Sequence, residues 1–106
     1  MELLNWIQNW FYKQCNGDWE HENRISITTI DNPGWHVAIN LLETELEKKI
    51  MKLVKFERSE DDWFFCKVEN GVFSGAGGPM NLQEILQIFY NWAKSQEVTD
   101  FNEKSK

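Results

Sequence analysis

The chain has 106 residues, of which 42% are hydrophobic and 26% charged, the composition of a single globular domain and not of a disordered segment. Aromatic residues reach 14% and include six tryptophans, whose large apolar area allows even a short chain to bury a core. Lys and Arg number 11 against 17 Asp and Glu, and the resulting net charge of −6 disfavours binding to nucleic acid.

The N-terminal segment MELLNWIQNW has neither the basic residues nor the small-residue cleavage site of a secretory signal. No apolar run approaches the ~20 residues that cross a bilayer, so we expect no membrane partner. In such a chain the two cysteines, Cys15 and Cys66, are expected to be reduced thiols. We therefore expect a cytoplasmic protein.

The first predicted element is an amphipathic helix over residues 3–15, with Gly17 able to adopt the left-handed conformation that closes a helix. Apolar and polar residues then alternate with a period of two, which predicts strands over 24–29 and 35–41. Between them lies Asp31-Asn32-Pro33-Gly34. Proline followed by glycine favours a type II turn, in which the glycine has a positive φ. The sequence thus predicts a β-hairpin.

The middle of the chain predicts three further strands. Residues 43–49 have no apolar face and are interpreted as a polar connection or one short turn. Strands are then expected over 50–58 and 62–69, around the turn at Ser59-Glu60-Asp61. The dipeptide Asn70-Gly71 is a strong hairpin signal and leads to a short strand over 72–74.

The last predicted element is a helix with Asn81 as its N-cap and Glu84 as the partner in a capping-box-like pair. Its apolar side chains cover one side, as those of the first helix do. Two such helices covering one face of an antiparallel sheet of four or five strands define a two-layer α+β fold. We assign this domain to residues 1–96 and predict a polar, frayed tail over 97–106.

One candidate for chemistry is Cys15, which precedes His21 by six positions, a spacing similar to the Cys-x5-Arg loop of sulfur- and phosphate-transferring enzymes. Histidine stands where the anion-binding arginine would be, and the end of a helix raises the pKa of a thiol. A structural thiol is therefore favoured. A cysteine-dependent sulfurtransferase stays as an alternative.

A second candidate is the glycine-rich stretch Ser74-Gly-Ala-Gly-Gly-Pro79 before the last helix. It resembles a phosphate-binding loop in outline but lacks the Lys and Ser/Thr that such loops use. A corner at which the backbone passes close to the sheet explains it better. Binding of a nucleotide or another small ligand at Gly75–Gly78 remains the other alternative.

Metal and acid–base sites are weakly indicated. The segment Glu20-His21-Glu22, with His36 elsewhere, lacks the spacing of a metal site. The acidic run Glu60-Asp61-Asp62 is typical of a solvated turn. We predict no metal, no cofactor and no catalytic residues, and hence a binding protein, not an enzyme.

The tryptophans divide into two groups. Trp6, Trp10 and Trp92 lie on predicted helix faces that must be buried, and Trp35 alternates with core positions. Trp19 stands in an acidic loop. Its ring either covers the core or is an exposed anchor of the kind enriched at protein interfaces.

Five strings, in chain order, resemble the immunity protein 53 family: LNWIQNWF, CNGDWEH, TTIDNPGWHVAINL, ERSEDDWFFCKVENGVFSGAGGP and NLQEILQIFYNWA. The resemblance covers residues 3 to about 94. It implies a bacterial immunity protein of a polymorphic toxin system, which neutralises a cognate toxin by stoichiometric binding, without turnover or cofactor. The acidic balance favours a basic toxin, because opposite charge steers association.

We expect the toxin-binding surface to have two parts. The first is the acidic aromatic loop of Asp18, Trp19, Glu20, His21 and Glu22. The second is the turn of Glu60, Asp61, Asp62 and Trp63. Both place carboxylates beside large rings at predicted loop positions, which is the motivation for this hypothesis.

Overall fold

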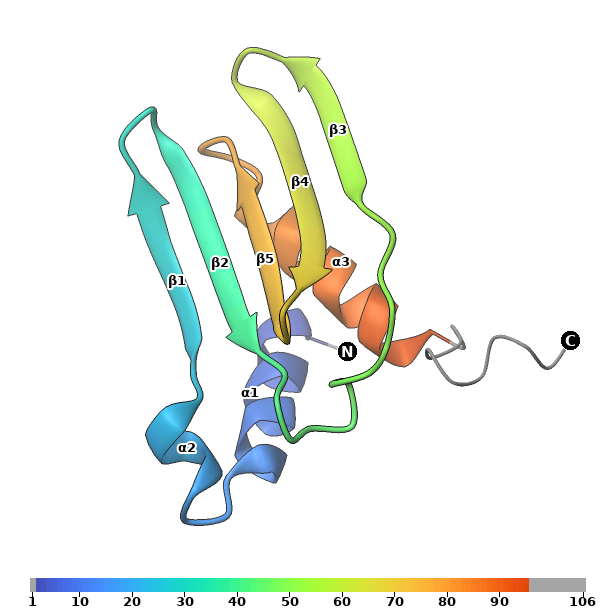
Figure 1. Cartoon of the computed structure of the whole chain (residues 1–106). Coiled ribbons are helices and arrows are strands. Elements are labelled where there is room, and N and C mark those ends of the chain that lie inside the picture. The colour runs from blue at the N-terminus through green and yellow to red at the C-terminus, as the bar shows by residue number, and fades with distance from the viewer. Residues whose placement is uncertain (1, 96–106) are drawn as a thin grey trace, which may run out of the picture.

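A computed structural model describes residues 2–95, which form three helices and five strands in a two-layer α+β arrangement (Figure 1). The predicted fold class is thereby confirmed, whereas the predicted tail over 97–106 lies outside the described residues. The elements, in chain order, are α1 (Leu3–Gln14), α2 (Trp19–Glu22), β1 (Ile25–Ile30), β2 (Gly34–Asn40), β3 (Val54–Ser59), β4 (Asp62–Glu69), β5 (Val72–Gly77) and α3 (Leu82–Lys94).

The five strands form one antiparallel sheet in the order β1-β2-β5-β4-β3. Three hairpins, β1–β2, β3–β4 and β4–β5, account for most of the pairing. The long-range pairing of β2 with β5 joins the first hairpin to the other strands, with Val37 opposite Gly75. The long helices α1 and α3 lie on the same face of this sheet (Figure 1).

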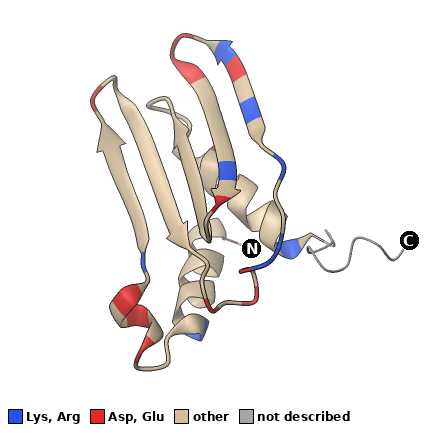
Figure 2. Cartoon of the chain, viewed as in Figure 1, with Lys and Arg blue, Asp and Glu red and all other residues tan. Residues whose placement is uncertain are grey.

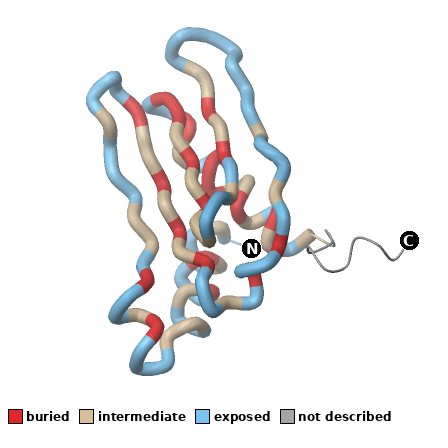
Figure 3. The backbone as a smooth tube through the Cα atoms, in the orientation of Figure 1, coloured by how far each residue is buried: buried red, intermediate tan, exposed pale blue. Residues whose placement is uncertain are grey.

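The core fills the space between the sheet and the two long helices. Along β2, Val37 and Ile39 are fully buried, and they alternate with partly exposed residues whose side chains point to the opposite face. Figure 3 shows this alternation as red segments along the central strands. The helices contribute the apolar faces expected from their sequences, namely Ile7, Trp10, Ile85, Leu86, Phe89 and Trp92.

The hairpins predicted at residues 31–34 and at Asn70-Gly71 are both present, as β1–β2 and β4–β5, but the turn type predicted for the first is wrong. Asn70 and Gly71 have φ values of 55° and 77°, as a two-residue type I′ turn requires. Gly34 is not in the positive-φ region. It pairs with Ile30 as the first residue of β2, and a Cβ there would collide with the carbonyl oxygen of Gly77. Glycine is needed here for close approach and not for a type II turn.

The strand predicted over 50–58 begins only at Val54. The residues before it contact α3 instead of entering the sheet. The indole N–H of Trp92 donates to the carbonyl oxygen of Ile50 over 2.9 Å, so this backbone group is already paired outside the sheet. Residues 43–48 form turns and a bend, and Lys49 makes an isolated β-bridge, so the segment is a connection as predicted. It is not wholly polar in its contacts, because Leu46 is buried in the core.

The last strand is longer than predicted, because β5 continues through the glycines to Gly77. A Cβ at Gly75 would lie 2.6 Å from Cγ2 of Ile85, and one at Gly77 would lie 2.9 Å from Cβ of Phe64. Glycine at these positions lets α3 pack directly on the sheet. The glycine-rich stretch therefore belongs mainly to a strand, not to a corner.

Asn81 is the N-cap residue of α3, but its side chain does not make the predicted capping hydrogen bond. Its oxygen accepts a hydrogen bond from the backbone N–H of Trp63 at 3.3 Å, and its nitrogen donates to Glu84 at 2.6 Å. Asn81 is only 2% exposed, so it joins β4 to the start of α3 from inside the protein.

The segment 41–53 is held against the rest of the protein by tryptophan indole groups. Trp10 donates to the carboxylate of Glu45 over 2.8 Å, and Trp19 donates to the carbonyl oxygen of Leu42 over the same distance. Together with the bond from Trp92, these contacts attach the segment to three helices. A long irregular connection is thus ordered by side chains that the sequence places far away.

Candidate interaction surfaces

The acidic loop predicted as a contact surface is built around α2. Glu20 accepts hydrogen bonds from the backbone N–H groups of Asn16 and Gly17, both at 2.9 Å. The pKa of its carboxyl group is lowered by its own backbone N–H and then by those two donors. Gly17 has the predicted positive φ, at 95°. Glu20 therefore orders the loop that precedes α2.

Trp19 covers the core and is only 2% exposed. Its ring contacts Trp10 and Phe11 edge-on, with centroid distances of 6.4 and 5.8 Å. Of the two interpretations of this residue, the structure supports the buried one. A ring in this position is not available as an anchor for a partner.

The exposed carboxylates of the loop face a cleft of about 740 Å³ between α2 and the segment 41–53. Asp18 and Glu22 line it on one side, and Glu43 and Glu47 line it on the other. Figure 2 shows acidic residues at α2 and along the neighbouring connection. We call these four residues, with His21, the acidic cleft.

Glu43 and Glu47 were missed as site residues because their segment has no motif and is distant in sequence. Glu43 has a φ of 63°, and its backbone N–H donates to the carboxylate of Glu47 over 3.0 Å. This local turn holds both side chains at the mouth of the cleft. The clustering of acidic residues over 43–47 was the available signal.

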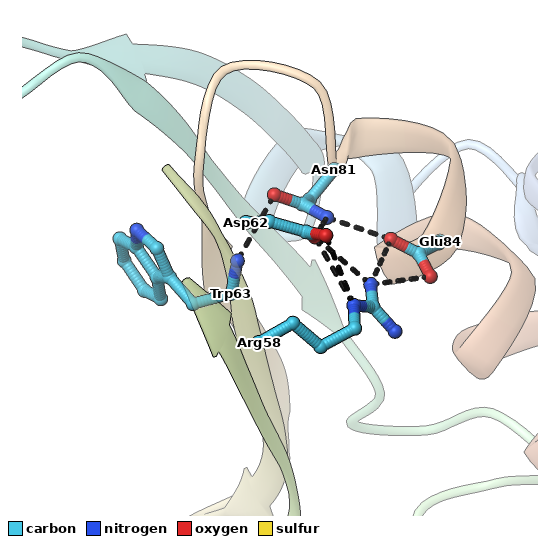
Figure 4. Close-up of polar contacts among 5 residues, drawn as sticks. All are labelled: Arg58, Asp62, Trp63, Asn81 and Glu84. Atoms are coloured by element: carbon cyan, nitrogen blue, oxygen red, sulfur yellow. Dashed lines mark hydrogen bonds and ion pairs between the residues drawn. The ribbon is translucent and has the colours of Figure 1, made fainter. Parts of the chain in front are cut away.

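The second predicted patch belongs to a polar network between the β3–β4 hairpin and α3 (Figure 4). Arg58 donates to Asp62 at 3.1 Å and to Glu84 at 2.8 Å. Asn81 donates to the same two carboxylates and accepts from the backbone of Trp63. This network connects the hairpin to the first turn of α3.

The charges in this network stabilise one another. Hydrogen bonds from Arg58 and Asn81 hold the pKa of Asp62 below its ordinary value, and hydrogen bonds to Asp62 and Glu84 raise the pKa of Arg58. Asp62 therefore forms an intramolecular ion pair with Arg58. Glu60 and Asp61 are exposed at the turn, as expected for its solvated part.

Trp63 points to the sheet face opposite the helices, where its ring stacks with that of Phe65 at a centroid distance of 6.3 Å. The two predicted patches thus lie at opposite ends of the sheet. α2 precedes Ile25, which is opposite Ile39 near the end of β2, whereas the β3–β4 turn lies beyond the pair Phe64 and Gly77.

The alternative enzyme site around Cys15 lacks an activated thiol. The sulfur of Cys15 lies 3.4 Å from the carbonyl oxygen of Phe11, and desolvation, followed by the charge of Glu20, raises its pKa. Burial raises the pKa of Cys66 to about 12. A nucleophilic cysteine needs the opposite shift, because the thiolate is the reactive form.

The alternative ligand site at Gly75–Gly78 is filled by protein. The space beside Gly75 and Gly77 is occupied by Ile85 and Phe64, and a Cβ at Gly78 would lie 2.7 Å from the carbonyl oxygen of Asp61. These close contacts leave a phosphate group no place on this side of the strand.

Within residues 2–95, no group of three or more His, Cys, Asp and Glu side chains is arranged to hold a metal ion. The described helices include none that is long and apolar enough to span a membrane.

The fold and the surfaces define a small α+β protein with an acidic cleft and with a raised thiol pKa at both cysteines. The model of the family described as immunity protein 53 matches residues 4–94, and the chain belongs to this family. It therefore has a toxin-neutralising immunity role, and its family membership implies a toxin as partner. No curated protein and no solved structure matches the chain.

Proposed function

We propose that this protein neutralises its cognate toxin by stoichiometric binding, without catalytic turnover, and that the acidic cleft contacts a basic region of the toxin. The observation that carries the proposal is the match to the immunity protein family over nearly the whole chain. The acidic cleft supports the choice of surface, because it gathers exposed carboxylates from two separate segments around a concave space.

The geometry changes the residues that should be tested. Glu20 orders its own loop and Trp19 is buried, so substitution of either would disturb the fold. Asp18 and Glu22 are exposed and line the cleft. Charge reversal at these two positions therefore tests binding with the least effect on stability.

The experiment is to co-express Asp18→Lys/Glu22→Lys with the toxin encoded beside this chain and to measure survival and association kinetics. We expect association to slow by about tenfold at low salt, because surface charge acts mainly on the rate of encounter. As the reference, we expect the wild-type chain to form a one-to-one complex with the toxin and the cells that express both to survive.

A matched variant, Glu60→Lys/Asp61→Lys, changes the net charge equally but at the opposite end of the sheet. We expect it to associate faster than the cleft variant, because the field at the cleft is unchanged. Equal effects of the two variants would show that only net charge matters. Survival of cells without any complex would contradict the binding proposal itself.

A further inference from the structure

We propose that the free edge of β1 accepts an extended segment of the toxin as a sixth strand, with the apolar side chains of that segment entering the groove between β1 and α1. This inference rests on the proposed function, because it takes the toxin as the partner. It names the mode of binding, which neither the sequence nor the family membership specifies.

The first observation is that β1 is an edge strand without the features that usually prevent an edge from pairing with a further strand. Its sequence, ISITTI, carries no charge and no proline, and its register with β2 is continuous from Ile25 to Ile30. The other edge strand, β3, carries Lys55, Glu57 and Arg58, and its register shifts between Glu57 and Ser59. Charges and bulges are the devices that prevent pairing at an edge. β3 has both, and β1 has neither.

The second observation is the direction of the free backbone groups. The backbone N–H of Asn40 donates to the carbonyl oxygen of Arg24 over 3.1 Å, so Arg24 belongs to a hydrogen-bonded pair with β2. Pairs alternate along antiparallel strands. The N–H and C=O groups of Ile25, Ile27 and Thr29 therefore point away from β2, where an added strand would bind them.

The third observation is a partly apolar groove on the helix side of the same edge. A hollow of about 650 Å³ has an apolar wall made of Leu4, Ile7, Phe11 and Ile25, and the rest of its lining is polar or charged, namely Gln8, Glu20, Asn23 and Arg24. Leu4 in this groove is 57% exposed, and Ile27, which lies on β1 outside the groove lining, is 39% exposed, so both apolar side chains are accessible to a partner. Alternate side chains of an added strand point to one face, so this groove would receive them.

Two features favour a toxin segment over a second copy of this chain. Asn23 lines both the groove and the acidic cleft, so a strand on β1 would continue directly into the carboxylates. A basic flank would be complementary there. A twofold β1–β1 pair would place Arg24 of one chain near Asp31 of the other, but it would also bring together two chains that each carry a net charge of −6. The proposed occupant is an extended segment with alternating apolar residues and a Lys- or Arg-rich flank.

The test compares Thr29→Pro with Thr29→Val in binding to a catalytically inactivated form of the toxin encoded beside this chain. Proline removes an outward-facing donor and leaves the hydrogen bonds to β2 intact, as is tolerated on edge strands. Valine keeps the donor and the β-branched shape. We expect Thr29→Pro to bind about tenfold more weakly than Thr29→Val, with the difference in the dissociation rate.

A second measurement follows amide hydrogen exchange by NMR in the free chain and in the complex. The amides of Ile25, Ile27 and Thr29 should exchange quickly in the free chain and become protected on binding. Those of Ser26 and Thr28, which point to β2, should be protected in both states. Leu4→Ser should weaken binding, whereas Tyr12→Ser, on the same helix but outside the groove, should not.

The possible results separate the two proposals. If the wild-type chain does not bind the toxin at all, the proposed function fails. If it binds but Thr29→Pro equals Thr29→Val and the edge amides stay exposed, the binding proposal survives and the edge-strand inference is overturned. Protection of the same amides in the free chain at high concentration, with a doubled mass, would overturn it in favour of a second copy.

Discussion

The ammonium group of Lys49 lies 2.7 Å from the carbonyl oxygen of Trp92 and 2.8 Å from that of Ser95, at the C-terminal end of α3. It also lies 5.7 Å from the centroid of the Trp92 ring. Lys49 is only 9% exposed, so its positive charge faces the negative end of the helix dipole inside the protein. This contact fixes the segment 41–53 on α3.

The first prediction follows from this contact. Lys49→Met keeps the length of the side chain but removes the three donors of the ammonium group and its positive charge at the negative end of α3. We expect the free energy of unfolding to fall by about 2 kcal/mol, measured by urea denaturation. Lys52→Met, in the same segment but exposed, is the control. Equal loss from both variants would contradict the capping role.

The second prediction concerns the burial of Trp19. Trp19→Ala should lower the free energy of unfolding by about 3–5 kcal/mol, because it removes a large ring and the indole N–H bond to Leu42. Trp63→Ala should cost clearly less, since the Trp63 ring lies on the opposite sheet face and is partly exposed. Thermal denaturation of both variants would decide this. A stable Trp19→Ala protein with lost toxin binding would restore the anchor interpretation.

The third prediction is a pH dependence that comes from Asp62. Its pKa is lower in the folded state than in the unfolded state, so the unfolded chain binds a proton more readily. The stabilisation is therefore present above the unfolded pKa and is lost as the pH falls through the folded pKa. Asp62→Asn should be less stable than the wild type at neutral pH, and the difference should shrink in strong acid. Urea midpoints measured from pH 7 down to pH 2 test this, with Asp61→Asn as the control.

The fourth prediction concerns the close packing of α3 on β5. Gly75→Ala should destabilise the protein by about 1–3 kcal/mol, because the new Cβ meets Cγ2 of Ile85. Ile85→Leu removes that branched methyl group. The double variant should therefore recover part of the loss, which a double-mutant cycle would measure. Simple additivity of the two changes would show that the clash is relieved elsewhere.

The fifth prediction tests the cysteine chemistry. With a pKa near 12, Cys66 should resist a thiol reagent such as DTNB until the protein unfolds. Cys15 should react in the folded state, but more slowly than free cysteine at the same pH, because its pKa is also raised. Cys15→Ser should protect cells from the toxin as well as the wild type does. Loss of protection by this folded variant would favour the sulfurtransferase alternative.

Local patterns in the sequence predicted most of the helices, strands and turns, because these elements depend mainly on residues that are neighbours in the chain. The helical periodicity placed the end of α1 to within one residue, the start of α3 follows Asn81 as predicted, and Asn70-Gly71 specified its turn. The errors at the glycines have a common cause. Gly34, Gly75 and Gly77 are required by atoms on other strands and on α3, and such contacts leave no local signal.

The residues of the candidate surfaces were harder to predict from the sequence than the fold was. Acidic residues at 18–22 are visible as a motif, but whether Trp19 is buried depends on the distant carbonyl group of Leu42 and on the ring of Trp10. Likewise, Asp62 looks like part of a solvated run and is instead held by Arg58 and Asn81. Polar residues have no periodicity that distinguishes an exposed role from an internal one.

The sequence by itself determined the class of fold, the hairpins and helices and, through its strings, the family, since these follow from local propensity and from residue order. Only the tertiary structure decided which strand has a free edge, which glutamates share the acidic cleft and which glycines are needed for packing. Strand order depends on the long-range pairing of β2 with β5, such as Val37 with Gly75, whose partners are far apart in the chain. A free edge and a cleft are properties of that order, so they exist only once the chain has folded.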